Sequence, residues 1–435
     1  MNMFYWVKPG FRFCLVIVLG YCTSIPITVA ETIPKPLTLK QAIEFTLDQN
    51  PQLHQFQFVQ QRLSANRHTS ALKPAYKLSF DLENFAGSGE TNGLDNAEMT
   101  VALSSILELG DKRRSRSELV DAGLFKAELE QQVATLDLLG DLTATFINAL
   151  TLQEELNLAS KEVSLSQSLL KAVKIRAQQG SGSDIEVMRA RAMLNQSKIR
   201  KNTLLQKLKQ QKVSVAKYWA ETTVNFSNFD GSLYAFSKPE KFKTLFDKLK
   251  ASPAIEVFAS ELRIKKAGIQ LAKSQGSGDI EWQVGVRQYE QSGDNALTLG
   301  LSIPLFSESR NQGAINAALA DQNAVHYQRQ DVMLALHEQL FIAYTQRQQY
   351  IETYQQLKTQ VIPDLEKALK LTREAYNRGR LKYQDWILAQ QELLKAQQQL
   401  INNASSALIN QSVIEQLTAE PLTIKNTLKG KTNEQ

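Results

Sequence analysis

The chain has 435 residues, of which 50 are Lys or Arg and 44 are Asp or Glu, and its formal net charge at pH 7 is +6. This charge is small for the length, and the basic residues are interleaved with acids and glutamines, which argues against a nucleic-acid-binding protein. Prolines are absent between Pro74 and Pro239 and sparse between Pro253 and Pro421, which favours very long helices over two or three globular domains. Beyond the first thirty residues, no uninterrupted apolar run approaches the ~20 residues of a membrane-spanning helix.

Residues 1–30 are predicted to be an export signal that is removed. Lys8 and Arg12 precede a short apolar core, and Thr28-Val29-Ala30 offers small residues for cleavage. The alternative is a single membrane anchor, for which the apolar core is too short. Bulky Tyr21 argues against lipidation at Cys22. Since both cysteines lie in the signal, the mature chain must be held by packing, a closed sheet or oligomerisation instead of disulfides.

The mature chain contains the same pattern twice, in residues 31–230 and 231–420, and ends in a tail at 421–435. Each copy has an opening helix, two alternating strands, a very long helix, a glycine-centred break and a return helix. The glycines at the breaks, Gly180 and Gly379, are 199 residues apart. The first opening helix is expected from Leu39 to about Leu72, with Thr38 as its N-cap, and the second from near Glu240.

The very long helices are predicted at 112–179 and 311–378, inside helical hairpins at 112–222 and 311–417. Each would span ~100 Å. Such helices, with apolar residues three or four apart, can bury their apolar stripes only against other helices. A cytoskeletal coiled coil shares this composition, and the strands distinguish the two alternatives.

Four segments of about ten residues alternate apolar and polar side chains, at 76–85, 98–105, 280–289 and 296–305. Turn-rich segments, 86–96 and 291–295, join the members of each pair. This design is typical of outer-membrane strands, and a soluble sheet packed on a helix is the alternative. We assign the faces with Lys77, Asp81, Glu83 and Arg287 to a water-filled lumen. The residues assigned to lipid are Tyr76, Leu78, Phe80, Leu82, Met99, Val101, Leu103, Trp282, Val284, Val286, Leu297, Leu299 and Leu301.

Four strands from one chain cannot enclose a pore. A bilayer admits strands only in a closed barrel, because open edges would leave backbone groups unpaired in hydrocarbon. Two, three or four copies would supply 8, 12 or 16 strands, so the sequence predicts an oligomer that shares one barrel between subunits.

With this arrangement, the chain resembles the TolC-like outer-membrane efflux factors over nearly all of its mature length. The resemblance rests on Leu37-Thr38-Leu39-Lys40-Gln41-Ala42 with Asn50-Pro51, on Leu301-Ser302-Ile303-Pro304-Leu305, and on Tyr376-Asn377-Arg378-Gly379 leading to Asp385. Within the family it is most similar to the heavy-metal branch typified by CzcC and CusC. The residues are Asp81-Leu82-Glu83-Asn84-Phe85-Ala86-Gly87, Leu107-Glu108-Leu109-Gly110-Asp111-Lys112-Arg113 and Ala216-Lys217-Tyr218-Trp219.

The resemblance implies a mainly α protein with a membrane β-barrel in the outer membrane of a Gram-negative bacterium. It implies a homotrimer with a 12-stranded barrel and a helical tunnel across the periplasm, docked to a membrane-fusion adaptor and an inner-membrane, proton-driven RND-type pump. The protein would be no enzyme but a passive exit duct, with heavy-metal cations as the expected cargo. A duct for drugs or type I secreted proteins and a periplasmic coiled-coil scaffold without a channel stay open as alternatives.

The resemblance also assigns roles at the hairpin turns. Glu186 and Asp385 match gate aspartates, and Tyr376 matches a gate tyrosine. Repeated in a trimer, the carboxylates would surround a narrow mouth, attract cations and repel one another as the mouth contracts. Ala177 replaces the tyrosine in the first copy, and Leu388 and Leu381 replace a second gate aspartate and a gate arginine, so a closing network that is looser or built differently is expected. The expected adaptor contacts are Gly180, Ser181, Gly379, Arg380 and Leu381.

No cofactor, metal site or catalytic constellation is predicted. The four histidines have no paired ligand spacing, and Met188 and Met193 are interpreted as packing residues. Lys112-Arg113-Arg114 with Arg116, just after a strand, could meet lipid phosphates on the periplasmic side, with a solvated helix start as the alternative.

Overall fold

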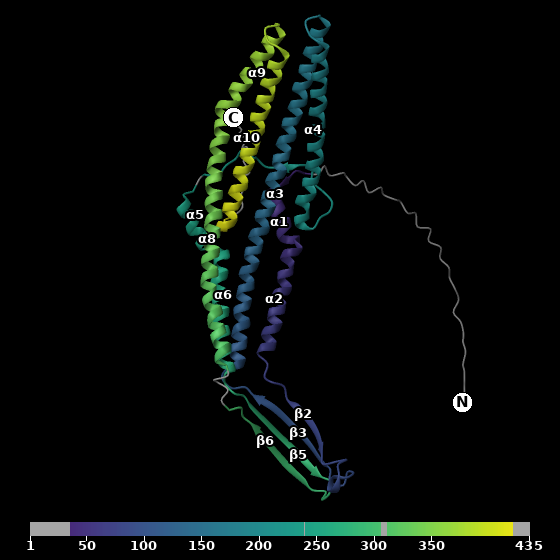
Figure 1. Cartoon of the computed structure of the whole chain (residues 1–435), viewed down its shortest axis with the longest axis vertical. Coiled ribbons are helices and arrows are strands. Elements are labelled where there is room, and N and C mark those ends of the chain that lie inside the picture. The colour runs from purple at the N-terminus through teal and green to yellow at the C-terminus, as the bar shows by residue number, and fades with distance from the viewer. Residues whose placement is uncertain (1–34, 239, 306–310, 421–435) are drawn as a thin grey trace, which may run out of the picture.

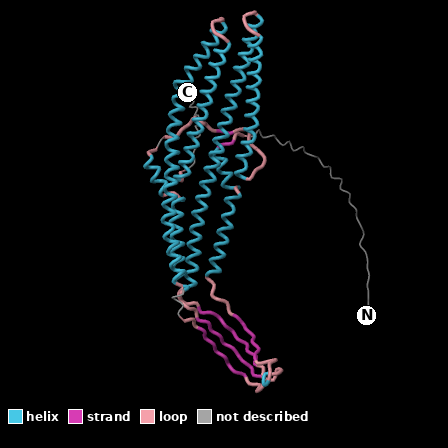
Figure 2. Tube along the Cα trace, viewed as in Figure 1, coloured by secondary structure: helices cyan, strands magenta, loops and turns pink. Residues whose placement is uncertain are grey.

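The computed structural model describes residues 35–238, 240–305 and 311–420; the predicted export signal and the 421–435 tail lie outside this range. The molecule is elongated (Figures 1 and 2). A bundle of long helices ends in two hairpin turns at one end and continues into a four-stranded sheet at the other.

The first copy starts with the short strand β1 (Leu37–Thr38), and its helices are long. Its elements are α1 (Leu39–Gln49), α2 (Pro51–Ser70), β2 (Lys77–Glu83), the 3-10 turn η1 (Gly89–Thr91), β3 (Glu98–Leu107), α3 (Lys112–Gln178), α4 (Asp184–Ala216), the 3-10 turn η2 (Lys217–Trp219) and β4 (Phe229–Asp230). With 67 residues, α3 is ~100 Å long.

The second copy repeats this order. Its elements are α5 (Phe242–Lys250), α6 (Pro253–Gln275), β5 (Ile280–Tyr289), β6 (Asn295–Ser302), α8 (Gln312–Gln356), the π-helical segment η3 (Leu357–Val361), α9 (Ile362–Asn377) and α10 (Tyr383–Thr418). The mainly helical class with long antiparallel hairpins agrees with the sequence prediction.

The predicted continuous opening helix from Leu39 to Leu72 is wrong, because the chain breaks at Asn50. Asn50 adopts an extended backbone (φ −71°, ψ 121°), since the following Pro51 disfavours helical geometry in the residue before it. Its side chain then caps α2 by accepting from the backbone N–H of Gln52 at 2.8 Å. Ser252, before Pro253, makes the equivalent break between α5 and α6.

The second long helix is not uniform over 311–378 as predicted. Pro363 has no backbone N–H, so the carbonyl oxygen of Thr359, four residues earlier, receives no α-helical hydrogen bond from it. The helix accommodates this as a π-helical segment from Leu357 to Val361, where the N–H of Ile362 bonds the carbonyl of Leu357.

The sheet has the strand order β2-β3-β5-β6, and every neighbouring pair is antiparallel. β5 has its predicted bounds, and the other three strands differ slightly from theirs. β2 ends at Glu83 because Asn84 takes a positive φ of 56°, and β3 continues two residues further than predicted, to Leu107. β6 ends at Ser302, since Pro304 cannot donate to a ladder.

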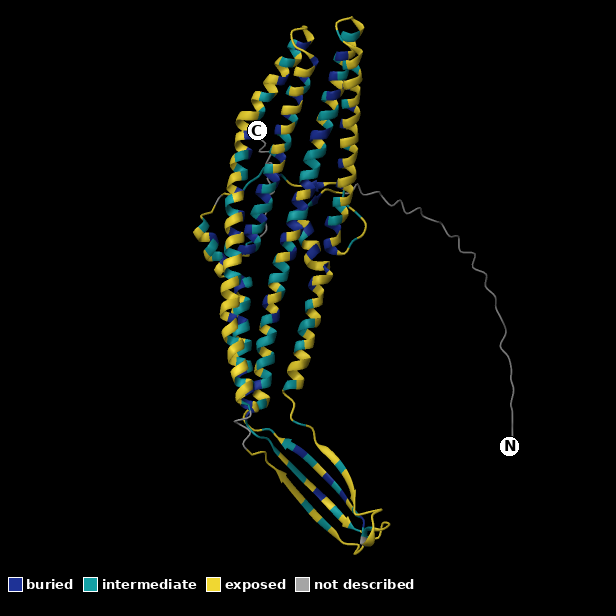
Figure 3. Ribbon diagram, viewed as in Figure 1, coloured by how far each residue is buried: buried dark blue, intermediate teal, exposed yellow. Residues whose placement is uncertain are grey.

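The largest apolar core lies at the waist of the molecule, where α3 meets α1, η2 and β4. Leu142, Phe146 and Leu150 of α3 are buried there with Trp219 and Phe229. Figure 3 shows buried stretches, in dark blue, at this level of the bundle. β1 and β4 pair in parallel at the same level, with Leu37 opposite Phe229. Among the described helices, α3 is long and apolar enough to cross a membrane by length and composition, but 44% of its most apolar window is buried in this chain, as in a core helix.

Candidate functional site

The two hairpin turns have the same backbone geometry. Gly180 and Gly379 both have a φ of +74°. The N–H after each glycine donates to a carbonyl five residues back: Ser181 to Arg176 at 3.0 Å, and Arg380 to Ala375 at 2.9 Å. A left-handed glycine with this bond closes a helix C-terminus, so the repeat extends to the hydrogen bonds of its turns.

The predicted gate carboxylates, Glu186 and Asp385, each occupy the third position of the return helix in their copy. Asp385 is exposed, and its Oδ2 accepts from the backbone N–H of Lys382 at 2.8 Å, so it caps α10. Glu186 is half-buried, and Ser183 caps α4 by accepting from the N–H of Ile185 at 3.1 Å. Asp385 thus has a structural task as well as a negative charge.

Arg176 links the two hairpins within one chain, and the sequence analysis missed it. Its Nη1 donates to the carbonyl oxygen of Tyr376 at 2.9 Å, and its Nη2 donates to that of Ser181 at 3.1 Å. The guanidinium also lies over the Tyr376 ring, 4.5 Å from its centroid. An arginine in the last turn of a helix was the available signal, because cations favour helix C-termini.

Behind the turns, α3, α4, α9 and α10 meet in a buried cluster that we call the tip seam. Its members are Leu169, Val173, Ala190, Leu369, Tyr376, Tyr383, Trp386 and Leu393. Gln390 falls on the same face of α10, four residues after Trp386 and three before Leu393, and it is fully buried (0% exposed).

The tip seam buries polar groups without pairing them. Within the part of the chain that the structure describes, the hydroxyls of Tyr376 and Tyr383 and both amide atoms of Gln390 have no hydrogen-bond partner. Burial raises the pKa of both tyrosines, and the nearby Glu186 carboxylate adds to the shift. A buried polar group without a partner costs about 1–3 kcal/mol, so this packing carries a penalty that water would relieve.

The outer surfaces of the turns are exposed, including all five predicted adaptor contacts: Gly180, Ser181, Gly379, Arg380 and Leu381. The first two turns of the return helices add large exposed apolar side chains. One of them is Met188, which does not pack within this chain as predicted. Ile185 and Met188 of α4 are 64% and 67% exposed, and Leu388 of α10 is 57% exposed.

At the other end of the molecule, the ladder brings the predicted lipid-facing residues together on one face. One row across all four strands is Leu78, Leu103, Val284 and Leu299, and the next is Phe80, Val101, Val286 and Leu297. Most of these side chains are well exposed, as for Leu299 at 76%. Figure 3 shows how much of the sheet is open to solvent.

The opposite face of the sheet is polar, and Arg287 pairs with three of its side chains. Arg287 donates to Glu98 at 2.7 Å, to Glu83 at 2.9 Å and to the hydroxyl of Thr100 at 2.9 Å. Thr100 and Ala102 are buried on this face, at 4% and 1% exposure. A water-soluble sheet buries its large apolar face, so this distribution is the reverse of a soluble sheet.

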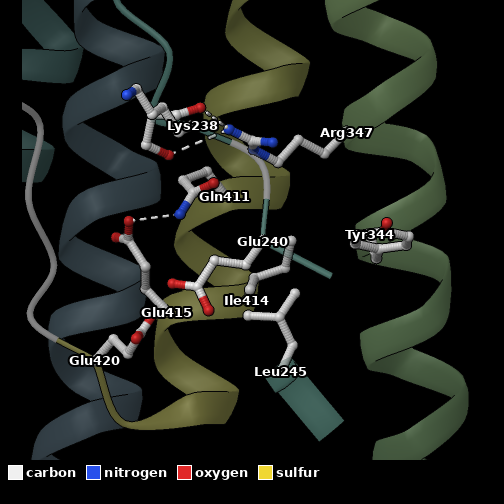
Figure 4. Close-up of a pocket in the computed structure, with 10 residues that line it drawn as sticks. Lys238, Glu240, Leu245, Tyr344, Arg347, Gln411, Ile414, Glu415 and Glu420 are labelled. Atoms are coloured by element: carbon white, nitrogen blue, oxygen red, sulfur yellow. Dashed lines mark hydrogen bonds between the residues drawn. The ribbon is translucent and has the colours of Figure 1, made fainter. Parts of the chain in front are cut away.

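A polar pocket of about 240 Å³ lies at the waist between α8, α10 and the segment before α5 (Figure 4). Arg347 is buried there, and its Nη2 donates to the carbonyl oxygen of Ser237 at 2.7 Å. Burial lowers the pKa of Arg347, an effect that the carboxylate of Glu415 opposes. Lys248 binds both Glu240 and Glu420 at the same site. These contacts hold Ser237 and Glu240 against the helical bundle.

The described residues contain no group of three His, Cys, Asp or Glu side chains that could hold a metal ion. His337 instead packs edge-on against Phe242 and Phe246, with ring centroids 5.4 and 4.8 Å away.

Comparison with known proteins gives one family and several relatives. The family described as Outer membrane efflux protein matches residues 42–221 and 248–420. The cobalt-zinc-cadmium resistance protein CzcC of Cupriavidus metallidurans is 24% identical over 302 residues, covering 68% of this chain and 71% of the relative. The pyoverdine export outer membrane protein OpmQ of Pseudomonas putida is 24% identical over 223 residues, covering 48% of this chain and 46% of the relative.

Solved structures share the fold at low sequence identity. The crystal structure of CusC has a TM-score of 0.75 and 16% identity, covering 88% of this chain and 92% of that one. The outer-membrane channel OprN has a TM-score of 0.74 and 17% identity, covering 88% and 90%. The outer membrane protein VceC of Vibrio cholerae has a TM-score of 0.71 and 16% identity, covering 88% and 97%.

Proposed function

The chain belongs to the outer membrane efflux protein family, and on that premise we propose that three subunits form the passive exit duct of a tripartite efflux system. The four-stranded sheets close a shared 12-stranded barrel in the outer membrane, and the helical hairpins form a tunnel in the periplasm. A membrane-fusion adaptor and an inner-membrane RND-type pump supply the other two parts, and the pump supplies the energy.

The observation that carries this proposal is the sheet itself. Its large apolar side chains share one exposed face, and β2 and β6 are edge strands with no further partner in the described chain. An apolar face of this kind suits lipid, and unpaired edges cannot remain in hydrocarbon. Pairing β6 of one subunit with β2 of the next subunit removes every edge when the ring of three subunits closes.

The tips are the proposed gate and adaptor contacts. Glu186 and Asp385 lie in the first turns of the return helices, and Tyr376 is packed under Arg176. In a trimer they would contribute two carboxylates per chain to the periplasmic mouth. Arg176 replaces, from the first copy, the closing arginine that the sequence lacks at Leu381. We assign adaptor contact to Gly180, Ser181, Gly379, Arg380 and Leu381, because all five residues are exposed.

Heavy-metal cations are the proposed cargo. Support comes from the similarity to the cobalt-zinc-cadmium resistance protein, which covers 68% of this chain. The shorter similarity to a pyoverdine export protein supports an organic cargo as the second candidate. Growth of a deletion strain on graded Zn, Co, Cd, Cu, Ni and Ag salts, beside drugs and siderophores, separates the two. Unchanged tolerance to every metal would exclude the metal cargo.

The duct itself is tested on the purified protein. We expect heat-modifiable, detergent-resistant trimers in outer-membrane fractions and discrete single-channel currents in planar bilayers. A periplasmic scaffold would give soluble protein and no current, which would overturn the proposal.

A further inference from the structure

A pocket of about 470 Å³ lies where the sheet joins the helical bundle, and we call it the junction pocket. It is lined by Lys73 and Pro74, which lead into β2, and by residues 106–114, which lead from β3 into α3. The proposed function gives this pocket no task, although the basic run at 112–114 already stood out in the sequence.

Two aromatic rings fix the depth of the junction pocket in the proposed membrane. Tyr76 and Trp282 lie at the bundle end of the sheet and contact each other edge-to-face, with centroids 6.2 Å apart. Tyrosine and tryptophan on the lipid face of a barrel mark the level where hydrocarbon meets headgroups. Lys73 lies three residues before Tyr76, or ~10 Å along an extended chain, so it reaches the level of the lipid phosphates.

Most charges around the junction pocket are already paired. Lys112 binds Asp279 at 2.7 Å, Arg116 binds Glu108 at 2.5 Å, and Arg114 binds Glu118 at 2.8 Å. The remaining carboxylate, Asp111, precedes α3 and lies close enough to raise the pKa of Arg114 together with Glu118.

Two cations remain. The side chains of Lys73 and Arg113 are exposed and make no ion pair or hydrogen bond with the described residues. Beside them, Leu107 and Leu109 are 54% and 39% exposed. The pocket therefore offers two free positive charges next to an apolar surface that continues the lipid-facing sheet.

We propose that the junction pocket binds the phosphate of an anionic phospholipid from the periplasmic leaflet. Lys73 and Arg113 bind the phosphate oxygens, and Leu107 and Leu109 contact the glycerol and upper acyl chains. A free phosphate ion would use the two cations but not the apolar surface. The inference rests on the proposed placement of the sheet in the membrane.

Native mass spectrometry of the full mature protein, purified in detergent and titrated with phosphatidylglycerol or phosphatidylcholine, tests this site. We expect the wild type to retain phosphatidylglycerol preferentially. We expect the double variant Lys73→Gln/Arg113→Gln to bind phosphatidylglycerol roughly tenfold more weakly, because each cation near the lipid phosphate adds to the affinity for the anionic lipid. The matched control, Lys207→Gln/Lys209→Gln on exposed positions of α4, removes the same charge and should bind like the wild type.

Three results would overturn the lipid site: equal retention of both lipids by the wild type, equal weakening in the control, or displacement of the lipid by excess inorganic phosphate. Each of these can occur while the protein still forms heat-modifiable trimers and conducts ions, which leaves the proposed duct intact. A wild type that does not enter membranes would overturn both the duct and the lipid site.

Discussion

The sheet and the tip seam differ in how many of their polar groups are paired. On the sheet, Arg287 is paired with two glutamates and a threonine, and the strands are held in one register. Among the described sheet residues, one buried polar side-chain atom, Oγ1 of Thr298, has no partner. In the tip seam, two tyrosine hydroxyls and the amide of Gln390 are buried without partners. Paired polar groups specify one arrangement, whereas unpaired ones lower the cost of leaving it. We therefore expect the sheet to keep one arrangement and the tip seam to rearrange more easily.

The largest effect is expected from a charge on the lipid face of the sheet. Val284→Arg should destabilise the barrel by about 2–4 kcal/mol near the midplane and reduce the yield of outer-membrane trimers. Gln283→Arg, one residue away on the polar face, is the control and should assemble normally. Equal yields of the two variants in outer-membrane fractions would mean that the faces are assigned wrongly.

The next effect tests how tightly the register is held. A methyl group on Gly285 would lie 2.8 Å from Ala102 Cβ, Thr298 Oγ1 and the carbonyl oxygen of Val101, so Gly285→Ala forces the strands apart. We expect a loss of about 1–3 kcal/mol, seen as a lower temperature of trimer dissociation. In Gly300→Ala the nearest atom is 3.6 Å away, and this variant should dissociate like the wild type. A sheet that tolerates both changes equally would be looser than this register implies.

At the tip seam, one substitution should stabilise the packing of α3, α4, α9 and α10 that the structure shows. Gln390→Met keeps the volume and removes the unpaired amide, so the seam should gain about 2 kcal/mol. The measurements are slower amide hydrogen exchange at the start of α10 and smaller channel currents. Gln391→Met on the exposed neighbouring position is the control. Faster exchange in Gln390→Met would show that the amide has a partner in the closed tip.

The smallest effect separates the charge of Asp385 from its role as a cap. Asp385→Ala removes both and should cost about 1 kcal/mol in α10 stability, whereas Asp385→Asn keeps an acceptor for the Lys382 N–H. Both variants should reduce the cation selectivity of reconstituted channels, but the alanine variant alone should lose thermal stability. Unchanged currents in both would remove Asp385 from the gate.

The sequence was sufficient for the features that follow from periodicity and repetition. The alternating strands predicted which residues share a face, and the glycine spacing located both turns. Single-residue effects were less accessible. The Asn50-Pro51 pair already indicated the break before Pro51, although a continuous helix was predicted. A helix can respond to a proline by kinking or by forming a π-helical turn, and packing against neighbouring helices determines which occurs before Pro363.

Contacts between the two repeats of the chain were not predictable, since they join residues that are remote in sequence. Arg176 and Tyr376 are 200 residues apart, and only the packing of α3 against the second hairpin brings them together. The unpaired amide of Gln390 was hidden for the same reason, because a glutamine in a glutamine-rich helix looks solvated until its surroundings are known.

The strand order β2-β3-β5-β6 joins the two copies through β3 and β5, in the same antiparallel manner in which β6 and β2 would join neighbouring subunits. In the proposed trimer, the seam inside a chain and the seam between chains are therefore quasi-equivalent. The ring has the geometry of a hexamer of half-length chains, and a gene duplication that fused two halves would have changed the connectivity while leaving the wall of the duct nearly unaltered.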